Sequence, residues 1–195
     1  MKIEKIILFL IIFSFSLISC SYGEGTEINI SPLTPETITQ AIDEHGSARF
    51  VLHYIFNDSK RTKIFFGGIE GGEEKWLKLY PTFRSATDAV FSLTLDISLA
   101  YSIKNNPRFA LEMLYEGGGE AKEICGHFNE SWTDGGDYTE SSIRSAMQET
   151  NLRAKALNSL SSEFLYPNIL NDCKETLQKD TEYWEKELVR ISSTK

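Results

Sequence analysis

The sequence contains few of the residues, and none of the motifs, on which many enzymes depend. It has three cysteines and three histidines in 195 residues, without the H-E-x-x-H pattern or the Cys and His clusters of a zinc site. No serine lies in a G-x-S-x-G motif, and no glycine-rich loop ends in Gly-Lys-Ser or Gly-Lys-Thr. We therefore expect no metal ion and no cofactor, and the sequence marks out no catalytic set.

Basic residues are also in deficit, with 20 Lys and Arg against 28 Asp and Glu and a net charge of −8. Without residues 1–19, which hold two lysines and one glutamate, the net charge becomes about −9. This balance argues against tight binding of nucleic acid or anionic lipid by the surface as a whole. With 41% hydrophobic residues, the chain can form a core, and its length suits one domain.

The first 19 residues have the pattern of an export signal. Lys2 and Lys5 precede an apolar run over residues 6–13, and the chain turns polar directly after Cys20. The apolar stretch is shorter than the roughly 20 residues needed to span a bilayer. We therefore predict a removable signal peptide over residues 1–19.

Residues 17–20, Leu-Ile-Ser-Cys, resemble the lipobox of bacterial lipoproteins. The resemblance implies that Cys20 is acylated, carries palmitate or similar chains and anchors the protein in the lipid bilayer; an ordinary signal peptide is the alternative. Ser21 follows where an aspartate would favour the inner membrane, so we expect the periplasmic face of the outer membrane. Residues 20–31 are polar and predict a flexible tether, and residues 32–195 predict a single domain.

Apolar spacing in this domain favours an all-α fold of six to eight helices. Thr34 and Pro35 predict a helix start, and Gly46 predicts its end. Residues 50–56 and 62–66 also fit a β-hairpin. Helices are expected over about 35–46, 47–56, through 64–69, and over 86–104, 107–114, 138–160 and 170–191.

The segment 91–103 is the most ambiguous, because every odd position is apolar and the even positions are mostly polar, as in a strand. Its length and its leucines favour a buried helix, which Ser85 and Asp88 would begin. Asp96 would then need a buried hydrogen-bond partner, in a structural network or, less often, at a site that shifts its pKa.

The order of several landmarks resembles a group of exported bacterial proteins of about this size. They are Ile69-Glu70-Gly71, Trp76-Leu77, Leu79, Thr87-Asp88-Ala89, Asn106-Pro107, Leu111, Leu114, Ile124-Cys125 and Cys173. The resemblance covers about residues 48–177. It implies a compact helical fold, with HEAT-like helix pairs as one form, and a Cys125–Cys173 bridge, but it implies no activity.

The residues themselves also favour this bridge, since Cys125 and Cys173 are the two cysteines left in the domain and an oxidising periplasm pairs such thiols. The alternative is a catalytic thiol at Cys125 with His127 as its base. The loop of residues 129–140 is rich in acids but does not match a calcium-binding pattern. Gly117 and the two glycines after it predict a helix end rather than a phosphate site.

Two classes of function remain after these exclusions. The first is a membrane-anchored, non-enzymatic protein-binding module, for example an immunity protein against a periplasmic toxin, for which a basic protein is the expected partner. Candidate contacts are Trp132, Asp134 and Asp137, since a tryptophan ringed by acids is common at interfaces. The second is a hydrolase acting on the cell wall or another envelope substrate, with carboxylates gathered only in the fold. A structural or assembly lipoprotein is a further alternative.

Overall fold

The structure is a computed structural model that describes residues 28–87, 89–126, 138–160 and 164–193. Within these ranges every regular element is a helix, which confirms the predicted all-α fold. Eight of the helices in the described chain have eight or more residues, and α5 and α9 are single turns. The elements are α2 (Pro35–His45), α3 (Ala48–Phe56), α4 (Ser59–Glu70), α5 (Glu74–Leu77), α6 (Leu79–Ala86), α7 (Ala89–Ser102), α8 (Pro107–Glu116), α9 (Ala121–Ile124), α10 (Glu140–Asn158) and α11 (Pro167–Ser192).

Capping residues determine where the N-terminal helices begin and end. The Thr34 hydroxyl accepts the amide of Thr37 at 3.2 Å before α2, and Gly46 ends that helix with φ of 64°. Ser47 and Asp58 cap α3 and α4 in the same way. The alternative of a β-hairpin over residues 50–66 is therefore wrong, because Asp58 begins a helix rather than a turn between strands.

The chain joins the domain earlier than the sequence predicted. Ile30 is 6% exposed, Ile28 packs against the same core, and the amide of Ile30 donates to the Tyr54 hydroxyl at 3.3 Å. Residues 28–30 of the expected tether thus belong to the domain, because two alternating isoleucines fill the core beside α3.

The ambiguous segment 91–103 is helical, as predicted, and lies at the centre of the fold. Leu95 and Leu99 of α7 are fully buried, and so is Ile103 just beyond it. The predicted start of this helix is wrong at Ser85, which lies inside α6 and donates to the carbonyl of Thr82 at 2.9 Å. Asp88 lies outside the described residues.

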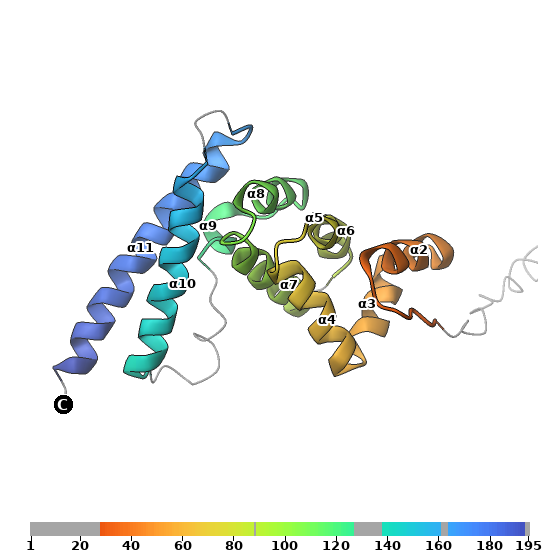
Figure 1. Ribbon diagram of the computed structural model, residues 1–195, viewed down its shortest axis with the longest axis horizontal. Helices are drawn as coiled ribbons and strands as arrows, with labels where there is room; N and C mark the ends of the chain where they lie inside the picture. Colours follow the sequence, from red (N-terminus) through yellow and green to blue (C-terminus); the bar gives the residue numbers. More distant parts are fainter. Residues whose placement is uncertain (1–27, 88, 127–137, 161–163, 194–195) are drawn as a thin grey trace, which may run out of the picture.

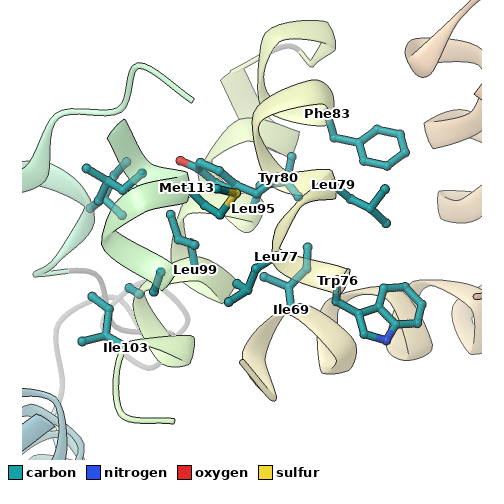
Figure 2. Close-up of a cluster of buried hydrophobic side chains, with 14 of the residues drawn as sticks. Ile69, Trp76, Leu77, Leu79, Tyr80, Phe83, Leu95, Leu99, Ile103 and Met113 are labelled. Carbon is teal, nitrogen blue, oxygen red and sulfur yellow. The ribbon is translucent and has the colours of Figure 1, made fainter. Parts of the chain in front are cut away.

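The main core runs from α2 to α11, and Figure 2 shows its central part, which lies among α4 to α8. The side chains of Trp76, Leu77, Tyr80 and Phe83 come from α5 and α6, two elements that the sequence analysis did not predict. The Trp76 indole packs so closely on α4 that a Cβ added at Gly68 would lie 2.3 Å from it. Trp76 is therefore a core residue.

Helices α10 and α11 lie side by side and form a hairpin at the C-terminal end of the molecule (Figure 1). A Cys125–Cys173 disulfide joins α11 to the residue that follows α9, which confirms the predicted bridge. On α10, the apolar Leu152 is 44% exposed. Arg153 points inward in its place and is fully buried.

Candidate functional site

A buried network surrounds Asp96, the acid for which the sequence predicted a partner. The Tyr80 hydroxyl donates to Asp96 Oδ1 at 2.6 Å, and Arg84 Nε donates to the same oxygen at 2.9 Å. Arg84 Nη2 reaches Oδ2 at 3.3 Å, and Nη1 reaches the carbonyl of Gly117 at 3.4 Å. The network thus joins α6, α7 and the end of α8.

The electrostatics of this network suit a structural role. Burial and the neighbouring Asp96 carboxylate raise the pKa of Tyr80, and the hydrogen bond to Asp96 raises the pKa of Arg84. Asp96 is 6% exposed, and both of its oxygens already accept hydrogen bonds. A carboxylate held in this way is poorly placed to exchange protons with a substrate.

A second buried cluster forms around Arg153, which sequence reasoning missed. Its Nη1 donates to the carbonyl of Cys125 at 3.0 Å, beside the disulfide, and its Nε lies 3.8 Å from Glu149 Oε1. Lys104 pairs with the other oxygen of Glu149 at 2.7 Å. The inward positions of α10 repeat every three or four residues, and this spacing is the signal that could have found Arg153.

Asp180 of α11 adjoins this cluster. Loss of hydration raises its pKa to about 6, and the attraction of the Arg153 guanidinium opposes that rise. Its Oδ2 would lie 3.1 Å from a Cβ added at Gly126, so the carboxylate packs against the backbone next to the disulfide. The cluster joins α9, α10 and α11 through buried charge.

An open groove with a volume of about 770 Å³ lies between α2 and the α5–α6 segment. Its lining includes apolar side chains from both walls, Ile42 on α2 and Leu79 on α6. Glu36 and Lys75 face each other across it and pair at 2.6 Å, and this hydrogen bond lowers the pKa of Glu36. Local sequence patterns gave no sign of the groove, because its walls are about 40 residues apart in the chain.

The residues predicted for lipidation and partner binding, Cys20, Trp132, Asp134 and Asp137, lie outside the described residues, as does His127. His45 and His53 are described, and no group of three or more His, Cys, Asp or Glu within the described ranges could hold a metal ion. The sulfur of Cys125 is bound in the disulfide, so the alternative of a catalytic thiol is wrong.

No described helix is long and apolar enough to cross a membrane. No family model, curated protein or solved structure matches the chain. The functional argument therefore depends on the chain's own residues.

Proposed function

We propose that the protein is a lipid-anchored, non-enzymatic protein-binding module of the bacterial envelope, held by acylated Cys20 at the periplasmic face of the outer membrane. An immunity protein against a periplasmic toxin is one example of such a module. The observation that carries the proposal is the groove between α2 and α5–α6, which is open to solvent and mixes apolar lining with charges of both signs. This composition suits a segment of another protein.

The engagement of two acids, the buried Asp96 and the exposed Glu36, favours binding over hydrolysis. Asp96 is held by Tyr80 and Arg84, and Glu36 in the groove is held by Lys75. A general acid or base needs a carboxylate with a free edge that reaches substrate. The acids at these two places are engaged with cations instead.

Groove-blocking variants test the proposal. Gln40 on α2 and Thr82 on α6 are exposed and line opposite walls, so Gln40→Trp or Thr82→Trp would fill the groove without changing the core. Ser145→Trp, at an exposed position of α10, is the matched control. We expect an envelope protein captured by the parent and by the control to be lost by both groove variants, in pull-downs from detergent extracts.

Two further variants test the predicted contact residue and the lipid anchor separately from the groove. Trp132→Ala tests the contact residue predicted from the sequence, and Cys20→Ala should release the protein from the membrane fraction. Partner capture that survives both groove variants would refute the groove as the binding site. Turnover of a cell-wall substrate by the purified protein, abolished by Glu36→Gln, would replace binding with hydrolysis.

A further inference from the structure

We propose that helices α3 and α4 carry a separate contact surface, which rests on the headgroups of anionic phospholipids. We call this surface the basic face. It consists of Arg49, His53, Lys60 and Lys63 together with the aromatic rings of Phe56 and Phe66 and the adjoining ring of Phe91 from α7. The groove binds protein in the proposal above, whereas the basic face binds lipid.

The first argument is local charge. Residues 47–70, which span α3 and α4, contain four basic and two acidic side chains and carry a net charge of +2, within a chain whose net charge is −8. Arg49, Lys60 and Lys63 are exposed, and none of the ion pairs in the described chain includes them. The acidic total that disfavours anionic lipid for the whole surface therefore does not apply to this segment.

The second argument is the aromatic stack between the cations. The Phe56 ring stacks on Phe91 with centroids 4.2 Å apart and on Phe66 at 5.4 Å, and all three rings are only half-buried. Arg49 and His53 line the same small hollow as Phe56 and Phe91, which places them beside the stack.

Lys63 lies one helical turn before Phe66, on the same side of α4. Aromatic rings among Lys and Arg are the usual composition of protein surfaces that lie on a membrane interface.

The third argument is the position at which the chain from Cys20 joins the domain. This argument depends on the proposed acylation of Cys20. The backbone amide of Ile30 donates to the Tyr54 hydroxyl of α3, and the Arg61 guanidinium of α4 lies 3.8 Å from the Tyr54 ring centroid. Cys20 precedes Ile28 by eight residues, and covalent geometry limits that length of chain to a span of at most about 28 Å.

A tether of that reach holds the α3–α4 region close to the bilayer. The α10–α11 hairpin lies at the other end of the molecule (Figure 1). The basic face is thus on the part of the domain that the anchor keeps nearest to lipid.

A fluorescent probe on the face tests this proposal in the full acylated protein. Ser59 is exposed and lies one turn before Lys63, so Ser59→Cys labelled with nitrobenzoxadiazole should brighten when the face meets lipid. The protein is reconstituted in vesicles of phosphatidylcholine alone, or with 30 mol% phosphatidylglycerol. We expect brightening only with phosphatidylglycerol, reversed by 500 mM salt.

Charge variants then identify the residues. One Lys or Arg near an anionic surface strengthens contact about fivefold. Arg49→Gln with Lys63→Gln should therefore lower the equilibrium constant of the contact about 25-fold, measured from the bright and dim fractions of the probe at 30 mol% phosphatidylglycerol. Lys155→Gln with Lys186→Gln removes the same charge from α10 and α11 and should change the strength of the lipid contact less than twofold.

Flotation of the vesicles distinguishes this proposal from the anchor. Retention in both vesicle types without brightening keeps the anchor and overturns the basic face. Loss of retention on phosphatidylcholine vesicles would refute the anchor. In that case, salt-sensitive brightening on vesicles with phosphatidylglycerol would still support the basic face, and no brightening on them would overturn the basic face. Brightening caused only by an added acidic envelope protein assigns the face to a protein partner and also overturns the proposal.

Discussion

Replacing Asp180 with asparagine should stabilise the protein at neutral pH. Burial raises the pKa of this carboxyl from 3.8 to about 6, so ionisation above pH 6 costs the folded state free energy. A shift of about 2 units corresponds to about 3 kcal/mol, which partial exposure reduces to about 1–2 kcal/mol. The attraction of Arg153 is already contained in the raised pKa, and Glu149 remains beside Arg153 in the variant.

The sign of the pH dependence follows from linkage. A carboxyl with a raised folded pKa contributes stability that is present below pH 3.8 and is lost as the pH rises through about 6. Asparagine does not ionise, so the variant should be more stable than the parent at pH 7.5 and within about 0.5 kcal/mol of it at pH 4.

Urea unfolding followed by circular dichroism, with the disulfide intact, measures both values. Glu185→Gln removes the same charge from an exposed position of α11 and should change stability by less than about 0.5 kcal/mol. If Asp180→Asn destabilised the protein at pH 7.5, attraction to Arg153 would outweigh the cost of burial and the reasoning would be wrong.

Four further substitutions have expected outcomes, each measured as a free energy of unfolding in urea. Cys173→Ser should lower it by about 4 kcal/mol, because the bridge closes a loop of about 49 residues; a loss below about 1 kcal/mol would contradict this. Tyr80→Phe should cost about 1.5–3 kcal/mol through the lost hydrogen bond to Asp96, and no cost would mean that Arg84 alone satisfies the carboxylate. Gly68→Ala should cost about 1–3 kcal/mol because its Cβ meets an indole, whereas Gly67→Ala, with open space around it, should stabilise α4 by about 0.5–1 kcal/mol; equal effects would refute the packing argument.

The helix ends were predictable from sequence where a polar cap, a proline and a glycine coincide. Thr34 and Pro35 begin α2 and Gly46 ends it, and Asn106 caps α8 just before Pro107. These signals act through backbone groups within one turn, so no tertiary information is needed to recognise them.

The missed elements have physical reasons. Helix α6 contains Pro81 at its third residue, where the first turn needs no amide donor, so a residue that usually breaks helices is tolerated. Arg153 was missed because a charged side chain is normally assigned to the surface. Its burial depends on Glu149, one turn earlier in α10, and on the Cys125 carbonyl, which only the fold brings near.

Of the two candidate surfaces, the basic face could be recognised from the sequence and the groove could not. The charge of the basic face is local in sequence and can be counted along α3 and α4, although the whole-chain total hides it. The groove is formed by helices from distant parts of the chain, so no local sequence pattern predicts it.

The disulfide also sets the covalent topology of the molecule. It closes a ring of backbone that runs from Cys125 through α10 to Cys173. A protease that cuts the chain once inside this ring, between Gly126 and Tyr138, opens the ring but leaves both fragments connected through sulfur. A single cut before Cys125 releases a fragment from the covalent assembly. In an oxidising compartment, cleavage within residues 127–137 would thus create new termini without detaching the α10–α11 hairpin, whereas a reducing compartment would remove the last covalent link between the two pieces.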